Sequence, residues 1–283
     1  MAAILDRIVA ATRARVAEAK RTTDLRDLER RAEQHEPRGF RRALENSHPP
    51  AENAGRVGQP QINVIAELKK ASPSKGLIRA SFNVVELARE LEAAGAAALS
   101  VLTDEEFFQG SLENLREASA AVAIPCLRKD FIVDEFQLLE ARANSADAVL
   151  LIVAALTQAG LASLARGARE SGLDVLCEVH DGDELQRGLD AGCDLIGVNT
   201  RDLRTFNVDL ETAFRLAEMF PAGVVRVAES GIRSSEDVAR LRAAGYDAFL
   251  IGESLMRAER PGEALRELLS QVPGTRYPVL GGI

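Results

Sequence analysis

Lysine is scarce in this chain, and its placement marks residues suited to acid–base chemistry. Only five of the 35 basic residues are lysines, and four of these stand in two short segments, at Lys69, Lys70, Lys75 and Lys129. Lysine differs from arginine because it can release and regain a proton near neutral pH once its surroundings tune its pKa. These lysines are therefore candidates for proton transfer.

Carboxylates occur in similar places, at the ends of apolar runs. Glu67 stands two residues before Lys69, so in a strand both side chains face the same way. Glu178 and Glu229 end two later runs, and Lys129 follows another. Neighbouring acids keep an ammonium group protonated, and burial can raise the pKa of a carboxylate into the range of a base. The pattern indicates either a catalytic network or a set of structural ion pairs.

Two glycine-containing segments indicate an anion site. Ser230 and Gly231 follow one apolar run, Gly252 and Glu253 follow the next, and each pair precedes a predicted helix. Backbone N–H groups are free at such positions, and the helix dipole favours an anion. A glycine in a tight turn is the alternative for either segment alone. Two such segments on neighbouring strands favour a phosphate site, with the Glu253 carboxylate pointing away from it.

These residues need a scaffold, and a pattern that occurs eight times after residue 61 supplies it. Each unit is a short, nearly continuous apolar run with a polar or glycine-containing end, followed by an amphipathic segment of roughly 10–15 residues. This pattern is typical of a parallel sheet covered by helices. The runs are 64–68, 97–102, 124–127, 148–153, 175–179, 195–198, 224–228 and 248–251. Helix signals are clear at 134–143, 157–170, 181–191 and 234–244, the last opening with Ser234 and Asp237 in a near capping box.

The expected fold is therefore α/β, a (β/α)8 TIM barrel with an N-terminal helical extension. We expect the helical extension and an exposed linker over 1–60, the barrel over 61–270 and a tail over 271–283. An open doubly wound sheet is the competing architecture, but no GxGxxG follows the first run. In a barrel the active site lies at the carboxyl ends of the strands. The polar residues near those ends are Glu67, Lys69, Thr103, Lys129, Glu178, Asn199, Arg201, Glu229, Ser230 and Gly252.

Composition narrows the function classes. A net charge of −8 and a pI near 5.2 argue against a general nucleic-acid binder but allow a small anionic substrate. The longest apolar run, 148–156, is too short to span a membrane, which takes about 20 residues. The cysteines Cys126, Cys177 and Cys193 are expected to be reduced core residues of a cytoplasmic protein. No metal site is predicted from the scattered histidines.

Longer segments resemble those of a known family. Residues 65–76 (IAELKKASPSKG) are similar to the signature of indole-3-glycerol phosphate synthase, the barrel enzyme of tryptophan biosynthesis. Further similar segments occur in the same order at 100–104, 108–111, 127–132, 178–180, 197–203, 229–232 and 252–256. The resemblance covers roughly residues 60–260, and the helical extension is also similar to that of the family.

The resemblance implies a lyase that requires no cofactor. Its reaction would be the ring closure of 1-(2-carboxyphenylamino)-1-deoxy-D-ribulose 5-phosphate to indole-3-glycerol phosphate, with loss of carbon dioxide and water. By the same resemblance Lys129 is the general acid, Glu178 is the general base in the dehydration, and Lys69 assists. The other members of this catalytic network are Glu67, Asn199 and Glu229. Association with other enzymes of the tryptophan pathway is left open.

The resemblance also implies how substrate is held. Phosphate would bind at Ser230, Gly231, Gly252 and Glu253, and the remaining substrate contacts would be Ser72, Phe108, Phe131 and Arg201. The two phenylalanines would pack on the anthranilate ring, although a phenylalanine on a barrel is more often part of the core. Arg201 would hold either the substrate carboxylate or the network around Asn199. Residues 71–76 would form a mobile lid, in which Lys75 is solvated when the lid is open.

Several alternatives accompany this interpretation. A phosphoribosylanthranilate isomerase-like enzyme would use a Cys/Asp pair, for which Cys126 and Cys177 lie slightly before the rim. A Schiff-base aldolase would need a depressed pKa at Lys129, and a barrel that binds a sugar phosphate without turnover is the non-enzymatic alternative. His180 is expected to be a loop residue before a helix. The N-terminal helices are expected to cover the rim and complete the substrate site.

Overall fold

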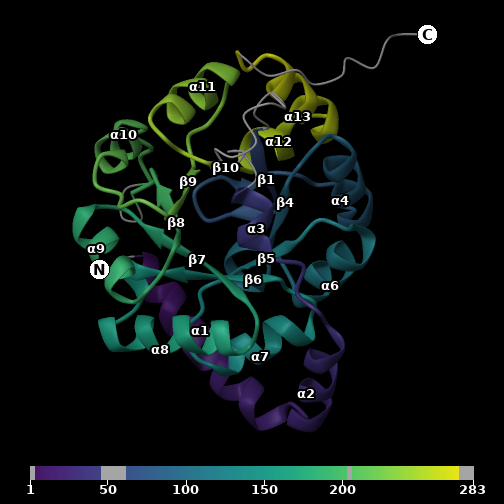
Figure 1. The fold of residues 1–283 in the computed structure, drawn as a ribbon. Helices are drawn as coiled ribbons and strands as arrows, with labels where there is room; N and C mark the ends of the chain where they lie inside the picture. Colours follow the sequence, from purple (N-terminus) through teal and green to yellow (C-terminus); the bar gives the residue numbers. More distant parts are fainter. Residues whose placement is uncertain (1–3, 46–61, 203–205, 274–283) are drawn as a thin grey trace, which may run out of the picture.

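The computed structural model describes residues 4–45, 62–202 and 206–273, and in these ranges it contains a closed barrel of eight parallel strands (Figure 1). Neighbours around the barrel follow the order β1-β10-β9-β8-β7-β6-β5-β4. The strands are β1 (Asn63–Leu68), β4 (Ala98–Leu102), β5 (Cys126–Lys129), β6 (Ala148–Ile152), β7 (Asp174–Val179), β8 (Leu195–Asn199), β9 (Val225–Glu229) and β10 (Ala248–Ile251). This confirms the barrel expected from the eight apolar runs.

The third barrel strand differs from its predicted limits. The apolar run stops at Leu127, but β5 continues through Arg128 to Lys129. Arg128 is buried because its guanidinium group pairs with Asp130 at 3.0 Å and with Glu140 at 2.7 Å. A buried charge that is paired and hydrogen-bonded can occupy a strand that apolar residues would otherwise fill. The extension makes Lys129 the last residue of its strand.

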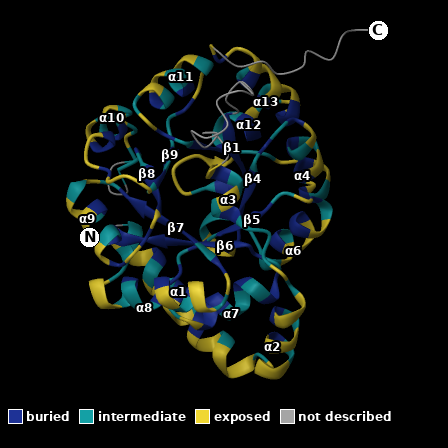
Figure 2. Cartoon of the chain, in the orientation of Figure 1, coloured by how far each residue is buried: buried dark blue, intermediate teal, exposed yellow. Residues whose placement is uncertain are grey.

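Helices form the outer layer around the strands, with buried inner and exposed outer faces (Figure 2). The main ones are α4 (Val84–Ala93), α6 (Leu112–Ala121), α7 (Phe136–Ala143), α8 (Gln158–Glu170), α9 (Gly182–Asp190), α10 (Glu211–Ala217), α11 (Ser235–Ala243) and α13 (Pro261–Ser270). Shorter helices are α5 (Glu105–Phe108), α12 (Glu253–Arg257) and the 3-10 turn η2 (Val153–Ala155). The capping box of Ser234 and Asp237 begins α11 as predicted.

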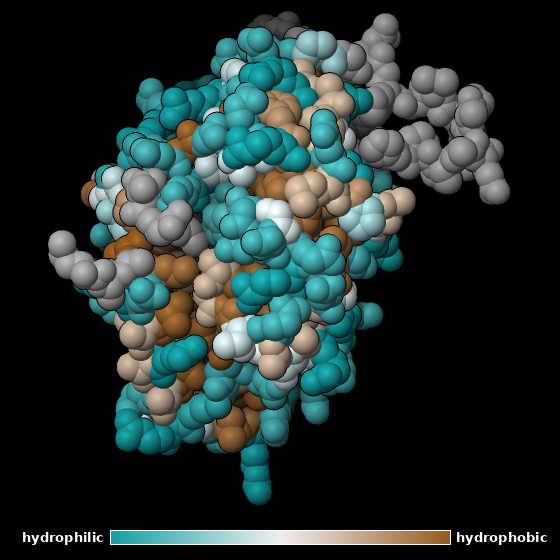
Figure 3. Space-filling model, turned by 90° about the vertical axis from the view of Figure 1, so that its left-hand side faces the viewer, coloured by the Kyte–Doolittle hydropathy of each residue, from teal (hydrophilic) through white to brown (hydrophobic). Residues whose placement is uncertain are grey.

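The face of the molecule in Figure 3 is largely hydrophilic, with apolar residues gathered between the polar ones. Among the described residues the large exposed apolar side chains are Leu25, Leu77 and Met219. No helix in the described ranges is both long and apolar enough to cross a membrane.

The N-terminal helices are divided between the two ends of the barrel, which corrects the expectation that they all cover the rim. Helix α1 (Ile4–Thr22) reaches the rim, α2 (Leu25–Gln34) packs on α7, and α3 (Phe40–Glu45) lies over the centre of the strand ring in Figure 1. Phe40 and Leu44 of α3 are fully buried in the interior cluster. Helix α3 therefore closes the end of the barrel opposite the rim.

The segment before α3 is fastened to the barrel by one carboxylate. Asp147, fully buried ahead of β6, accepts hydrogen bonds from the backbone N–H of Arg38 at 2.8 Å and of Cys126 at 2.6 Å. It also pairs with the Arg38 guanidinium and lies 3.2 Å from His35 Nε2. The predicted linker over 46–61 and most of the predicted tail, 274–283, lie outside the described residues, so the proposed domain limits stay predictions.

Because Phe40 fills the closed end of the barrel, we expect its truncation to destabilise the fold strongly. Phe40→Ala should lower the free energy of unfolding by about 3–5 kcal/mol, because a fully buried aromatic ring is replaced by a cavity. Urea denaturation followed by circular dichroism would measure it. Leu25→Ala is the matched control, since Leu25 is 48% exposed on α2 and its truncation should change stability by about 0.5 kcal/mol or less. Equal losses in the two variants would contradict a sealing role for α3.

Candidate active site

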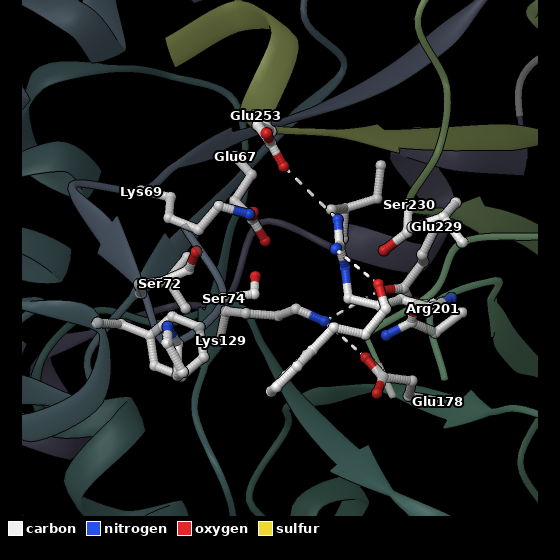
Figure 4. Close-up of a pocket in the computed structure, with 18 of the residues that line it drawn as sticks. Glu67, Lys69, Ser72, Ser74, Lys129, Glu178, Arg201, Glu229, Ser230 and Glu253 are labelled. Atoms are coloured by element: carbon white, nitrogen blue, oxygen red, sulfur yellow. Dashed lines mark hydrogen bonds and ion pairs between the residues drawn. The ribbon is translucent and has the colours of Figure 1, made fainter. Parts of the chain in front are cut away.

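A cavity of about 450 Å³ opens at the carboxyl ends of the barrel strands. This volume suits a small organic molecule, because ligand cavities typically span roughly 300–1,000 Å³. All fourteen site residues expected from the sequence line it: Glu67, Lys69, Ser72, Phe108, Lys129, Phe131, Glu178, Asn199, Arg201, Glu229, Ser230, Gly231, Gly252 and Glu253. In Figure 4 the labelled side chains point toward one another across the cavity.

Lys129 lies at the centre of the charged cluster. Its Nζ is 2.7 Å from Glu178 Oε2 and 2.9 Å from Glu229 Oε2, contacts drawn as dashed lines in Figure 4. The three side chains come from β5, β7 and β9; Glu178 and Glu229 are almost fully buried, and the Lys129 side chain is 12% exposed. A second pair, Lys69 Nζ and Glu67 Oε1, lies on β1 and the residue following it. The barrel thus brings together the lysines and carboxylates that the sequence places far apart.

The cluster sets an unequal distribution of protons. Burial by itself would lower the pKa of Lys129, but the charges of Glu178 and Glu229 outweigh it and raise that pKa. Burial would raise the pKa of Glu178, but the Lys129 ammonium lowers it to about 2. Burial raises the pKa of Glu229 to about 7, with the Glu178 charge adding to the effect. At neutral pH Lys129 is therefore charged, Glu178 is ionised, and Glu229 is partly protonated.

The charge distribution and the positions of the cysteines each disfavour one alternative. A Schiff-base lysine needs a depressed pKa, and the pKa of Lys129 is raised. The isomerase-like pairing needs a cysteine at the cavity, but Cys126 and Cys177 are buried in the core and neither lines it. The geometry instead fits a proton donor held beside an ionised acceptor.

Two glycines, one in a strand and one directly after a strand, leave the space that the carboxylates occupy. A methyl group at Gly197 of β8 would collide with Glu229 Oε1 and stand 3.0 Å from Glu229 Cδ. One at Gly252 would collide with Glu67 Oε1 and stand 2.9 Å from Glu67 Cβ. Because real Cβ atoms do not approach so closely, these positions must remain glycine if the carboxylates are to keep their places.

The Gly197 contact yields a test of this packing. Gly197→Ala should displace the Glu229 carboxylate from Lys129, lowering turnover and reducing the free energy of unfolding by about 1–3 kcal/mol through overpacking. Steady-state kinetics and urea denaturation would measure the two effects. Gly167→Ala, in helix α8 with only the flexible end of Leu138 nearby, is the control and should keep its activity. Full activity in Gly197→Ala would show that the position of Glu229 is unimportant.

The predicted anion-binding segments lie side by side at the ends of β9 and β10. Ser230 and Gly231 both have positive φ, 67° and 76°, which turns the chain sharply after β9. Short helix α12 begins at Glu253, directly after Gly252. The Glu253 carboxylate faces cations, with Arg257 Nε at 3.1 Å, and its expected direction away from a bound phosphate stays a prediction.

Arg201 also pairs with Glu253, while the two roles expected for it stay predictions. The guanidinium group lies 3.6 Å from Glu253 Oε2, while the Arg201 backbone N–H donates to Asn199 Oδ1 at 3.0 Å. Lys75 Nζ reaches the same Glu253 carboxylate at 4.0 Å but does not line the cavity. Arg201 thus contacts both the Asn199 network and the anion-binding segments.

Part of the cavity lining is an apolar wall. The rings of Phe108 and Phe131 are 6.2 Å apart between centroids, and Ile4 and Ile8 of α1 line the same cavity. The expected lid over residues 71–76 is a short antiparallel hairpin, β2 (Ala71–Ser72) with β3 (Gly76–Leu77). Its residues Ser72, Pro73 and Ser74 line the cavity. An aromatic ring would therefore meet side chains on this wall while charged groups meet the other.

Sequence reasoning missed the ion pairs that fix α1 to the rim. Arg15 of α1 pairs with Asp104 at 3.0 Å and with Asp130 at 3.2 Å, two buried carboxylates just after β4 and β5. Each aspartate stands within two residues of a strand end, and Arg15 shares a helical face with Ile4 and Ile8, but these positions alone do not pair them. Arg233 and Arg257, which also line the cavity, were missed as well.

The described residues contain no group of three or more histidine, cysteine or acidic side chains arranged to hold a metal ion.

Comparisons with known proteins give one consistent family. Residues 5–268 match the family model described as indole-3-glycerol phosphate synthase. A relative of that name from Koribacter versatilis is 59% identical over 269 residues, covering 95% of this chain and 100% of its own. Another from Burkholderia cenocepacia is 48% identical over 268 residues, covering 95% of this chain and 99% of its own.

Solved structures share the fold at much lower identity. KGPDC from Streptococcus mutans superposes with a TM-score of 0.57 at 14% identity, covering 75% of this chain and 97% of that one. Thiamine phosphate pyrophosphorylase from Pyrococcus furiosus superposes with a TM-score of 0.55 at 19% identity, covering 75% and 98%. At these identities the likeness establishes the barrel architecture alone.

Proposed function

Because the chain belongs to the indole-3-glycerol phosphate synthase family, we propose that its buried cluster divides the proton transfers of this reaction between Lys129 and Glu178. The enzyme is a carbon–carbon lyase: it closes 1-(2-carboxyphenylamino)-1-deoxy-D-ribulose 5-phosphate to indole-3-glycerol phosphate, losing carbon dioxide and water. The observation that carries the proposal is the 2.7 Å contact between the Lys129 ammonium and the Glu178 carboxylate. This contact places a proton donor and a proton acceptor side by side in the cavity.

The first proton transfer makes the new carbon–carbon bond. The ring carbon that bears the carboxylate attacks the ketone carbon, and Lys129 donates a proton to the ketone oxygen as negative charge develops there. The electrons of the departing carboxylate then restore the aromatic ring, and carbon dioxide leaves. The raised pKa of Lys129 ensures that the ammonium form is present when substrate binds.

The second proton transfer completes the indole. The hydroxyl group made in the first step leaves as water, aided by a proton from Lys69. Glu178 removes a proton from the neighbouring CH2 carbon, so that the double bond forms. Glu67 holds the Lys69 ammonium in place through their ion pair.

The two steps are coupled through charge. In the resting site the pKa of Glu178 is about 2, which makes it a weak base, and the Lys129 ammonium is the main cause of the lowering. Once Lys129 has given its proton to the ketone oxygen, that cation is gone and burial raises the basicity of Glu178. Glu178 thus becomes an effective base only after the first step, which orders the reaction.

The remaining groups would hold the two ends of the substrate. The phosphate would bind the backbone N–H groups at Ser230, Gly231, Gly252 and Glu253. The anthranilate ring would lie against Phe108 and Phe131, whose rings line the apolar wall. Arg201 would turn from Glu253 toward an anionic group of the substrate.

A direct assay tests the proposed function. Purified protein mixed with the carboxyphenylamino-deoxyribulose phosphate should produce indole fluorescence and release one carbon dioxide per indole formed. The matching analogue without the ring carboxylate is the control. It cannot release carbon dioxide, so it should not give one carbon dioxide per indole. Absence of both signals from folded protein would exclude the assigned reaction.

A further inference from the structure

His180 lies directly behind Glu178, the proposed base. It follows β7, does not line the cavity, and its side chain is only 14% exposed. Its Nε2 faces Glu178 Oε1 at 3.5 Å, on the carboxylate oxygen that Lys129 does not contact. Glu178 therefore lies between two nitrogen groups, one on each oxygen.

Helix α9 holds the ring of His180 in this orientation. Glu184 Oε2 accepts a hydrogen bond from the His180 backbone N–H at 2.8 Å and lies 2.9 Å from the ring Nδ1. An ionised carboxylate can only accept, so Nδ1 must carry a hydrogen. The free nitrogen, Nε2, is consequently the one directed at Glu178, and its side of the ring is buried without another hydrogen-bond partner among the described residues.

This arrangement favours the imidazolium form. A neutral ring with hydrogen on Nδ1 would point the Nε2 lone pair at the Glu178 carboxylate, whereas a protonated ring points an N–H at it. The titratable groups facing the ring are Glu178 of β7, Glu184 of α9 and Glu229 of β9. Burial works to lower the pKa of His180, but the hydrogen bond to Glu184 and the charge of Glu178 raise it.

A cation beside Glu178 would stabilise the ionised carboxylate between the two proton transfers. When Lys129 has donated its proton, the Glu178 carboxylate loses its main charge partner while remaining buried. A buried carboxylate without a cation takes up a proton and is then useless as a base. His180 is the other charged group on Glu178, and it is not consumed by the first step.

From this geometry we propose that His180, oriented by Glu184, is a positioning residue that keeps Glu178 ionised and aimed at the substrate after Lys129 has given up its proton. The inference rests on the proposed role of Glu178 as general base. His180 acts through Glu178 and does not itself touch the substrate.

Kinetics with His180→Gln and Glu184→Gln test this role. His180→Gln should lower kcat for indole formation by about 10- to 100-fold, as for residues that orient a reacting group from behind, and leave KM nearly unchanged. Glu184→Gln should have a smaller effect in the same direction. Asp183→Asn, which removes an exposed charge from the same turn of α9, is the control and should behave as wild type. Wild-type kcat in folded His180→Gln would overturn the proposal.

Proton NMR separates a charge effect from a merely structural one. The chain has three histidines, and the His180 signal is the one lost in His180→Gln. We expect His180 to titrate above the usual pKa of about 6.5 in wild type and near or below it in Glu178→Gln, where the facing charge is removed. An unchanged titration in Glu178→Gln would overturn the inference. Indole formation at the wild-type rate by Glu178→Gln would instead overturn the proposed function, whatever the titration shows.

Discussion

Lys129→Met should abolish both carbon dioxide release and indole fluorescence, lowering turnover by about 100- to 10,000-fold or more, because general acid catalysis typically contributes that much. The methionine side chain fills similar space but cannot donate a proton to the ketone oxygen. The new carbon–carbon bond would then not form, and every later step would stop with it. Parallel measurement of released carbon dioxide and of fluorescence under single-turnover conditions would show both losses together.

The interpretation of Lys129→Met depends on two controls. Lys20 lies on the surface of α1, and its Nζ pairs with Asp134 at 2.7 Å. Lys20→Met should leave turnover unchanged. Lys129→Arg keeps a positive charge between Glu178 and Glu229 but does not release a proton near neutral pH, so it should fold and remain inactive. Substantial activity in Lys129→Arg would mean that Lys129 contributes charge and not a proton.

Loss of the Lys129 ammonium should also be visible in stability. The side chain neutralises a buried group that includes Glu178 and Glu229, and breaking a buried pair typically costs about 3–5 kcal/mol. In Lys129→Met the carboxylates can escape part of this cost by taking up protons. The destabilisation should therefore shrink as the pH is lowered, which urea denaturation at several pH values would detect.

The barrel could be predicted because its strands are buried on both faces. Runs such as 148–153 and 248–251 are apolar throughout, and no helix or exposed strand would tolerate that pattern at this spacing. The prediction was incomplete at β5, where the strand continues past the apolar run into the charged residue Arg128. A paired charge inside a strand depends on residues such as Glu140, and no local pattern shows that partner.

The candidate site was predictable to the same extent, since strand ends converge on one rim. Glu67, Lys129 and Glu178 could be assigned to the cavity from strand position alone. What strand position could not supply were contacts made from outside the barrel. Arg15 meets Asp104 across 89 residues of sequence, and nothing local indicates their pairing.

The helices of the extension illustrate the same limit. Their periodicity predicts that they are helical and that one face is buried, but not which end of the barrel each one covers. Phe40 of α3 fills the end opposite the rim, whereas Ile4 and Ile8 of α1 line the cavity. That division depends on the connection between α2 and α3, where Arg38 binds Asp147.

Glu178→Gln should separate the two halves of the reaction. Lys129 remains in place and keeps Glu229 as a partner, so ring closure and decarboxylation should proceed. The amide cannot accept the proton whose removal forms the double bond, so dehydration should slow by about 100- to 10,000-fold. A single turnover should therefore release close to one carbon dioxide per active site with almost no indole fluorescence.

That pattern distinguishes Glu178 as the base of the second step from a residue that merely supports Lys129. If Glu178 acted only by holding the ammonium group, Glu178→Gln would lose carbon dioxide release and fluorescence in equal measure. Glu113→Gln, on the exposed surface of α6, controls for the loss of a carboxylate and should give both signals at the wild-type rate. In the proposed reaction Glu178 becomes basic only after Lys129 has donated its proton. Loss of Glu178 must therefore leave ring closure and carbon dioxide release intact while indole fluorescence is lost.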